Sequence, residues 1–336
     1  MRLPMLKAAV KRGALIAAAN WQVTLIQATA DSLFKILLAS PIIGGVFLVA
    51  LVLGGEPEAL MSLGWREMAA TIVSTLLSQP LVLTLFLLAV AVVAVGGSFF
   101  VFLIKAGTVA TIVRSDRDAG AIEDPPLRVD MVARASRFSV DSYVDACHAL
   151  FPRYARLGVI LMAVYMASGI GYLTLVAYRI GGEGWAMTTL ITATFIAWIT
   201  IVNLLYLLVQ IVIAADDCSV ASAARRVATF LRRELRTVGA IFLLVLALVV
   251  AATGASLLAT AALSLVAFVP FVGLAALPLQ LFAWLLRGVV FQYLGLTSVG
   301  AYLKVYRRMG SDPLHGSTQG IDTTRIMGSD PILTAK

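Results

Sequence analysis

The amino-acid sequence predicts an all-α, polytopic membrane protein with six transmembrane helices, and three observations lead to this fold class. Of the 336 residues, 60% are hydrophobic and 13% are charged, with a mean hydropathy of +0.95, whereas soluble domains carry about 25% charged residues. Several charge-free stretches reach the length of about 20 residues that crosses a hydrocarbon core. Lastly, 23 of the 26 Lys and Arg residues fall in four of the segments that flank or connect these stretches.

The apolar stretches are spaced as three hairpins. We expect spans at about residues 36–54, 80–104, 157–178 and 188–215, a fifth that begins near Val238 and a sixth that ends near Tyr302. Pro270 and Pro278 mark the last turn, because proline interrupts a helix.

The distribution of basic residues predicts the orientation. Five Lys or Arg residues lie in residues 1–35, eight in 105–156, five in 225–236 and five from 304 onward. Because basic residues are retained on the cytoplasmic side, both termini should be cytoplasmic, in a bacterial inner membrane. The net charge of +8 is then explained by this bias and by attraction to anionic lipids, and it does not indicate nucleic-acid binding.

The sequence contains an internal repeat, in which a similar segment precedes each predicted hairpin. The segment SVDSYVDACHALFPRYARLG from Ser139 aligns with SVASAARRVATFLRRELRTVG from Ser219, and ATADSLFKILLASPIIGG is a fainter copy. We therefore expect three units, at about 20–115, 138–216 and 218–303, each an amphipathic interfacial helix followed by a hairpin. Residues 1–35 would form surface helices, 36–303 the membrane domain, and 304–336 a cytoplasmic tail.

The surface helix of the third unit carries five arginines that can reach lipid phosphates or an acidic partner. These residues are Arg225, Arg226, Arg232, Arg233 and Arg236. Anchoring at the headgroups is the simpler interpretation, since juxtamembrane arginines serve this role generally.

The residue inventory offers no catalytic centre. Only His148 and His315 are present, so neither a histidine-based metal site nor a Ser-His-Asp arrangement is expected inside the membrane. The glycine pairs lack the GK[ST] of a phosphate loop and instead favour helix packing. All 18 carboxylates fall outside the apolar cores drawn above, which argues against a proton- or sodium-coupled transporter. We predict no enzyme activity, cofactor or metal.

Arg287 is the one basic residue expected in the middle of a span. The polar residues that accompany it in the last and fourth spans are Gln280, Gln292, Asn203 and Gln210. A guanidinium near the midplane requires a partner, because even the low estimate of its cost is about 2.5 kcal/mol. Three partners remain open: a neutral cage of these side chains, an anion such as a lipid phosphate or carboxylate, or an acidic residue of another membrane subunit.

Two stretches resemble a known family. VIAADDCSVASAARRVATFLRRELRTVGAIFLL, and later VPFVGLAALPLQLFAWLLRGVVFQYLG with AYLKVYRR, resemble bacterial six-helix membrane proteins related to the membrane domain of glycerophosphoryl diester phosphodiesterases. The resemblance covers about residues 20 to 308 and implies the topology. The histidine- and carboxylate-rich catalytic domain of that family's enzymes has no counterpart in this chain.

The function that we expect is a non-enzymatic membrane scaffold or accessory subunit of a larger assembly. Its partners would be anionic lipids and other membrane subunits. The tail, with MGSDP repeated at Met309 and Met327, is a candidate contact. The competing hypothesis is a transporter or lipid-handling protein that binds an anionic substrate or headgroup at Arg287.

Overall fold

The computed structural model describes residues 3–52, 64–126, 129–136, 138–179, 185–267 and 272–310, and every regular element in these ranges is an α-helix. Six helices contain segments long and apolar enough to cross a membrane, which confirms the all-α, multi-pass membrane class. These are α2 (Trp21–Val52), α5 (Pro80–Asp118), α7 (Val140–Arg179), α8 (Trp185–Asp216), α9 (Val220–Ala267) and α10 (Val272–Gly310). The shorter helices are α1 (Leu3–Ala19), α4 (Trp65–Ser78) and α6 (Val129–Ala135).

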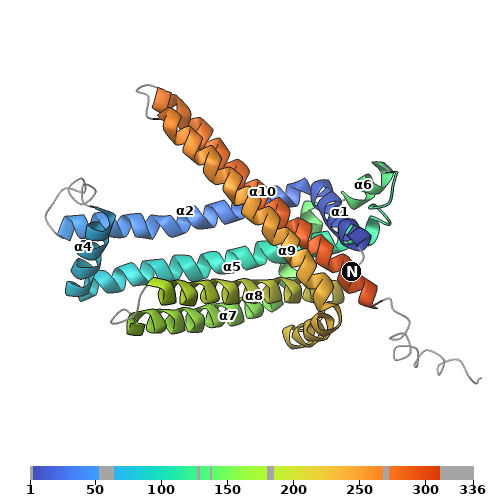
Figure 1. Cartoon of the computed structure of the whole chain (residues 1–336), viewed down its shortest axis with the longest axis horizontal. Helices are drawn as coiled ribbons and strands as arrows, with labels where there is room; N and C mark the ends of the chain where they lie inside the picture. Colours follow the sequence, from blue (N-terminus) through green and yellow to red (C-terminus); the bar gives the residue numbers. More distant parts are fainter. Residues whose placement is uncertain are drawn as a thin grey trace, which may run out of the picture.

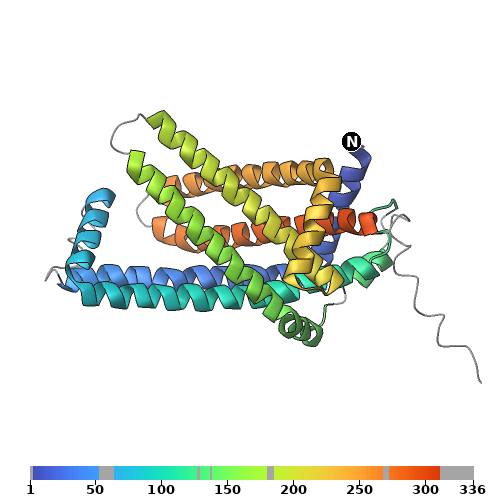
Figure 2. The same ribbon diagram turned by 90° about the horizontal axis from the view of Figure 1, so that it is seen from below.

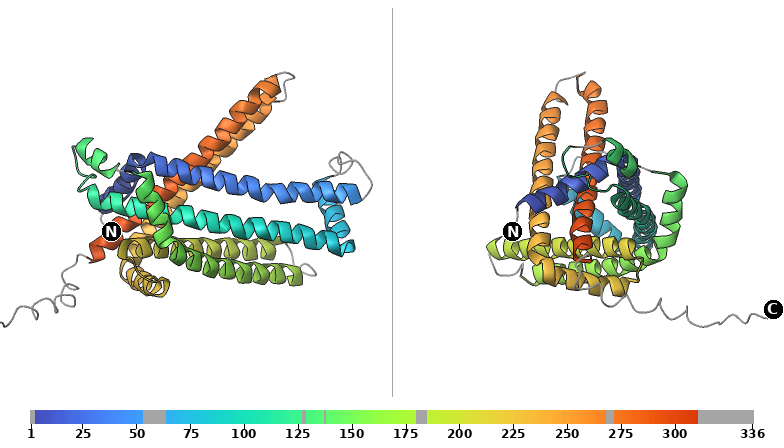
Figure 3. Two further views of the ribbon diagram at one scale, coloured as in Figure 1. Left: turned by 180° about the vertical axis from the view of Figure 1, so that it is seen from behind. Right: turned by 90° about the vertical axis from the view of Figure 1, so that its right-hand side faces the viewer.

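Long helices that are consecutive in the chain contact each other, α2 with α5, α7 with α8, and α9 with α10, and α5 also packs extensively against α7; we refer to the three consecutive contacts as the helix pairs. Figure 1 shows the α9–α10 pair crossing the other four helices obliquely, and Figure 2 shows the α7–α8 pair diverging from α2 and α5. The three pairs therefore converge at one end of the molecule and separate toward the other. We call the converged end the base. Figure 3 shows α1 and the end of α10 together at the base, while the other end of the α9–α10 pair projects away from the bundle.

The main hydrophobic core lies in the base, and a small second cluster forms away from it around Val49 of α2, with Val82, Leu83 and Phe86 of α5. The largest fully buried side chains of the main core include Tyr154, Phe230, Ile112, Ile213 and Leu303, contributed by five different helices. Toward the opposite end the same helices expose large apolar side chains, among them Leu81, Met166, Leu258 and Phe282. A membrane must cover these outer halves, because exposed apolar patches of this extent are rare in soluble monomers.

Closely packed glycines join the two ends of the chain. A Cβ atom on Gly13 of α1 would lie 2.2 Å from the carbonyl oxygen of Thr297 on α10, and one on Gly300 would lie 2.7 Å from Cα of Gly13. Only glycine permits this helix approach, so α1 is fixed against α10. Among the glycine pairs predicted to serve packing, Gly45 and Gly97 contact aromatic rings of the facing helix, whereas Gly181 and Gly182 lie outside the described residues.

The predicted surface segments of the second and third units are continuous with the spans that follow them. α7 has 40 residues and α9 has 48, or about 60 and 72 Å at 1.5 Å per residue. In α9 the backbone is non-helical at Glu234, with φ −115° and ψ 25°. Figure 2 shows the first part of α9 turned across the rest of the helix, so its arginine-rich segment and its apolar segment have different directions.

The first span begins earlier than the predicted residue 36. α2 is one helix from Trp21, and its apolar segment runs over Trp21–Phe47. Every 18-residue window within that segment contains Asp31 and Lys35. The prediction that all carboxylates lie outside the spans is therefore wrong for Asp31. The first span was predicted to start at residue 36 because a stretch without charged residues was sought, and this choice left out Asp31 and Lys35.

Candidate functional site

Arg287 lies where α10 faces α2 and α9, and there it lines a polar cavity of about 480 Å³. We call this cavity the polar chamber. It is lined by Asp31, Ser32 and Lys35 of α2, Thr253 of α9, and Trp284, Arg287, Gly288 and Phe291 of α10. The α10 residues recur at intervals of three and four, so they occupy one helical face. The same spacing places Lys35 one turn after Asp31.

A second cavity, of about 530 Å³, lies between α9 and α10, and we call it the apolar groove. α9 contributes Ala252, Ala255, Ser256, Ala259, Thr260, Leu263 and Ser264, and α10 contributes Gln280, Ala283, Trp284, Leu286, Arg287, Val290 and Phe291. Trp284, Arg287 and Phe291 line both cavities. Arg287 thus stands at the boundary between a charged compartment and a mainly apolar one.

The charges around the polar chamber are unequally paired. Nζ of Lys35 lies 2.6 Å from Oδ2 of Asp31. Lys105 of α5 does not line the chamber, and its ammonium lies 5.5 Å from the ring centroid of Tyr206. The guanidinium of Arg287 lies 5.6 Å from the ring centroid of Phe291. Within the described part of the chain Arg287 forms no ion pair, so the only acid in the chamber neutralises Lys35 and leaves the arginine without an anion.

Of the four polar side chains expected to surround Arg287, only one lines a cavity together with it. Gln280 lines the apolar groove with Arg287, but Asn203 accepts a hydrogen bond from Oη of Tyr165 at 2.5 Å and donates to the carbonyl of Ile199 at 3.0 Å. Gln210 is 2% exposed in the base, and Gln292 lines neither cavity. Asp31 and Lys35, which were not expected to take part, are the charged residues that line a cavity together with Arg287.

The five arginines of α9 are exposed, and four of them lie before the bend at Glu234, with Arg236 just after it. Arg226 forms an ion pair with Asp216 at the end of α8. Arg232 lines a further apolar cavity of about 480 Å³ between α8 and α9, together with Leu205 and Leu235. The five arginines are therefore accessible, with the charge of Arg226 compensated by Asp216, and their role as a headgroup or partner surface stays a prediction.

A polar stripe on α2 leads from the polar chamber toward the base. Its members are Asn20, just before the helix, then Thr24, Gln27, Asp31 and Lys35, at spacings that keep them on one face. Thr24 Oγ1 and Gln27 Oε1 are buried without a hydrogen-bond partner in the protein. Asn20 at the inner end accepts a hydrogen bond from Ser115 at 3.2 Å and donates to the carbonyl of Ala135 at 3.1 Å. Buried polar atoms of this kind are usually satisfied by ordered water.

An ionic cluster in the base connects α1 and the end of α10 to α5 and the segment after it. Asp116, 2% exposed, pairs with Nε of Arg12 at 2.5 Å and with Nη1 of Arg307 at 2.6 Å. Nη1 of Arg12 also donates to Glu123 Oε2 at 2.7 Å, and Lys304 pairs with the other oxygen of Glu123. Burial alone raises the pKa of Glu123, but the hydrogen bonds from Lys304 and Arg12 outweigh burial and lower it. Sequence analysis missed this cluster because the residues that pair in it are separated by about a hundred positions or more.

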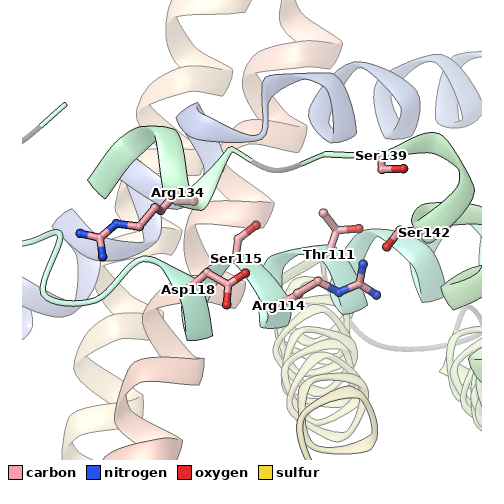
Figure 4. Close-up of a pocket in the computed structure, with 8 residues that line it drawn as sticks. Thr111, Arg114, Ser115, Asp118, Arg134, Ser139 and Ser142 are labelled. Atoms are coloured by element: carbon pink, nitrogen blue, oxygen red, sulfur yellow. The ribbon is translucent and has the colours of Figure 1, made fainter. Parts of the chain in front are cut away.

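A small polar pocket between α5, α6 and the start of α7 is a poorer candidate. Its volume is only about 10 Å³, which suits a single water molecule. Figure 4 shows the guanidinium of Arg114 turned toward Ser142, whereas that of Arg134 points away from the other side chains. The pocket therefore does not gather its two arginines around a common ligand.

No protein-family model, curated protein or solved structure matches the chain. The resemblance to the membrane domain of glycerophosphoryl diester phosphodiesterases thus stays a prediction. Among the described residues no group of three or more His, Cys, Asp or Glu side chains is placed to hold a metal ion. The function must accordingly be argued from the cavities and their charges.

Proposed function

We propose that this membrane protein handles lipids by binding an anionic amphiphile at Arg287. The observation that carries the proposal is that Arg287 lines both the polar chamber and the apolar groove. An amphiphile needs both compartments, one for its charged group and one for its hydrocarbon chain. A guanidinium is a suitable partner for the charged group, because its planar array of donors matches phosphate and carboxylate.

The surroundings of Arg287 support an added anion more than an internal cage. The chamber's acid is already paired with Lys35 at 2.6 Å, and Asn203 is hydrogen-bonded to α7 and to its own helix. A charged arginine in an apolar span without a counter-charge is costly. An anion from the membrane would remove this cost, and the separated helix pairs leave the two cavities accessible from the side.

The proposal includes a topology. Each helix pair with its preceding amphipathic segment would be one unit, with that segment at the cytoplasmic surface and the base facing the cytoplasm of a bacterial inner membrane. Supporting observations are the bend at Glu234 between the two parts of α9 and the placement of Arg12, Lys304 and Arg307 in the base. The proposal assigns no catalytic step.

The test compares lipids retained by purified Arg287→Gln and Arg156→Gln proteins. Arg156 is exposed on α7 and lines neither cavity, so its replacement is a charge-matched control. We expect wild type and Arg156→Gln to retain anionic lipid, and Arg287→Gln to retain about tenfold less, since a hydrogen bond to a charged group is worth about 1.5–3 kcal/mol. Equal retention of anionic lipid by all three proteins, measured by mass spectrometry, would exclude Arg287 as the lipid site.

A membrane scaffold or accessory subunit is the second candidate function. It is favoured by the exposed arginines near the start of α9 and around its bend, among them Arg225, Arg232 and Arg236. The tail expected to contact a partner, residues 311–336, lies outside the described residues. Purification in mild detergent should then recover partner subunits in fixed ratio, and replacing those three arginines by Gln should release them; a lone monodisperse protein would contradict the scaffold.

A further inference from the structure

The lining of the polar chamber contains two cations and one carboxylate. Its ionisable residues are Asp31, Lys35 and Arg287, and the apolar groove adds none besides Arg287. Asp31 and Lys35 pair at 2.6 Å on the same face of α2, so together they carry no net charge. Arg287 has no ion pair among the described residues, and its charge is the excess. Because an unpaired charge in an apolar surrounding is costly, the complementary ligand carries one negative charge.

The Asp31–Lys35 pair opposes headgroups with any other charge. A second negative charge on the ligand would be repelled by Asp31, and it could use Lys35 only by separating that lysine from Asp31. A ligand ammonium would need a carboxylate, and the only one in the lining is already paired. Admitting either group therefore breaks an ion pair and leaves one charge of the chamber without a partner, which is unfavourable.

Ser32 of α2 offers a second hydrogen-bond donor beside Arg287. A Cβ atom on Gly288, the residue after Arg287, would lie 3.9 Å from Oγ of Ser32, and both residues line the chamber. Over the ranges that the structure describes, the Ser32 hydroxyl has no hydrogen-bond partner. The other hydroxyl of the chamber, on Thr253, already donates to the carbonyl oxygen of Val249 at 2.8 Å. Ser32 is therefore the hydroxyl that is free to donate to an oxyanion held by Arg287.

We infer that the polar chamber selects a headgroup with one negative charge and no amine, whose phosphodiester or carboxylate oxygens bind Arg287 and accept a hydrogen bond from Ser32. The apolar groove holds the hydrocarbon chain, since Arg287 lines both cavities. This inference rests on the proposed function and names the ligand class of the same site. A phosphomonoester carries a charge of about −1.5 to −2 at pH 7, which exceeds the one positive charge available, so the chamber disfavours it.

The experiment is a competition among phosphatidylglycerol, phosphatidate and phosphatidylethanolamine with identical acyl chains, added to the full-length protein in detergent and measured by mass spectrometry. We expect phosphatidylglycerol to be preferred by about tenfold or more over the other two, because one hydrogen bond to a charged group has this value. A preference for phosphatidate, or equal binding of phosphatidylethanolamine, would overturn the inference. If that binding still required Arg287, the proposed function would stand; binding indifferent to Arg287→Gln would overturn both.

Replacing Asp31 should change the preferred headgroup. Asp31→Asn leaves Lys35 unpaired and raises the excess to two positive charges, so the preference should move to phosphatidate by about tenfold. Lys35→Gln leaves Asp31 as a counter-charge for Arg287, so phosphatidylglycerol should bind more weakly. Arg156→Gln is the control and should leave the preference unchanged. An unaltered preference for phosphatidylglycerol in Asp31→Asn would show that the pair does not set the charge of the ligand.

Two variants test the hydroxyl of Ser32. Ser32→Ala removes the available donor, and we expect phosphatidylglycerol to bind about tenfold more weakly. Thr253→Val removes a hydroxyl from the same chamber that is already bonded to its own helix, so binding should stay as in wild type. The same loss in both variants would exclude Ser32 as a specific contact of the ligand.

A last arm identifies the source of the single charge. Oleate carries it on a carboxylate, and phosphatidylglycerol carries it on a phosphodiester. Displacement of phosphatidylglycerol by oleate at equal concentration assigns the site to a fatty acid, and resistance to oleate assigns it to a phospholipid; either result supports a headgroup with one charge. Oleyl alcohol has the chain without the charge and should not compete. If it displaces phosphatidylglycerol as well as oleate does, the charge is irrelevant and the inference is wrong.

Discussion

Arg12 shows how a single side chain can fix the arrangement of the base. Its guanidinium donates to Asp116 and Glu123 and also to the carbonyl oxygens of Gly120 and Asp116, at 2.5 and 2.7 Å. Each of the three guanidinium nitrogens therefore donates to an acceptor in the last turn of α5 or in the segment that follows it. Because Arg307 and Lys304 of α10 bind the same two carboxylates, the cluster connects α1, α5 and α10.

We expect Arg12→Met to destabilise the protein by about 3 kcal/mol, the lower end of the range for breaking a buried ion pair. The lower end applies because Arg307 and Lys304 still neutralise the two acids. The measurement is the midpoint of thermal unfolding in detergent, with Lys7→Met, an exposed lysine of α1, as the control. If the two midpoints fall by the same amount, the cluster does not hold the base together.

The lowered pKa of Glu123 predicts a dependence of stability on pH. The unfolded chain binds a proton to Glu123 at its ordinary pKa of 4.5, whereas the folded protein does so only at lower pH. The stabilisation from Glu123 is therefore complete above 4.5 and is lost as the pH falls through the pKa of the folded state. Unfolding midpoints measured across this range should fall less steeply in Glu123→Gln than in wild type, and parallel curves would refute the assignment.

At the scale of the element, α2 combines two requirements that conflict in a membrane. Its length and hydropathy suit a span, yet one face carries the polar stripe from Thr24 to Lys35. Helices with this pattern turn their polar face toward protein or water and their apolar face toward lipid. Leu25 and Leu33, off the stripe, are 41% and 44% exposed, as expected for the lipid-facing side.

The stripe predicts a periodic pattern of reactivity along α2. In a background with Cys147 and Cys218 replaced by Ala, cysteines at Gln27 and Asp31 should react with a water-soluble thiol reagent, and cysteines at Leu25 and Leu33 should not. The physical reason is that such reagents attack the thiolate, which forms poorly in an apolar environment. Equal reaction at Asp31 and Leu33 would show that no hydrated path follows this face.

The sequence predicts that α2 is a membrane span, but it does not predict where the span begins or which distant residues form the ionic cluster. Hydropathy identifies α2 as a span, because apolar content is a local property. It misplaces the start of the span at residue 36, because a window that avoids charge must exclude Asp31 and Lys35. The ionic cluster is beyond a sequence pattern for another reason: Arg12 and Asp116 are separated by 104 positions, and only packing of α1 against α10 brings them together.

The whole molecule has a core at one end and lipid-exposed helices at the other. Most side chains buried below 2% exposure, such as Tyr154 and Ile241, belong to the base, and Val49 is an exception, whereas the outer parts of the helix pairs diverge (Figure 3). This division follows from the solvent, since lipid already satisfies apolar surface and only the base needs a hydrophobic core. Arg287 is not part of the core of the base and lines the two cavities formed by α2, α9 and α10.

The distribution of charge predicts which side of the membrane the base faces. Basic residues are retained in the cytoplasm, and the base holds the charged cluster of Arg12, Lys304 and Arg307. In the background without native cysteines, Arg156→Cys on the base side should react with a membrane-impermeant reagent only after the cells are permeabilised. Glu67→Cys on α4, exposed at the opposite end, should react in intact cells. The reverse pattern would place the base outside, and the polar stripe of α2 would then open the Arg287 chamber to the outer leaflet instead of the inner one.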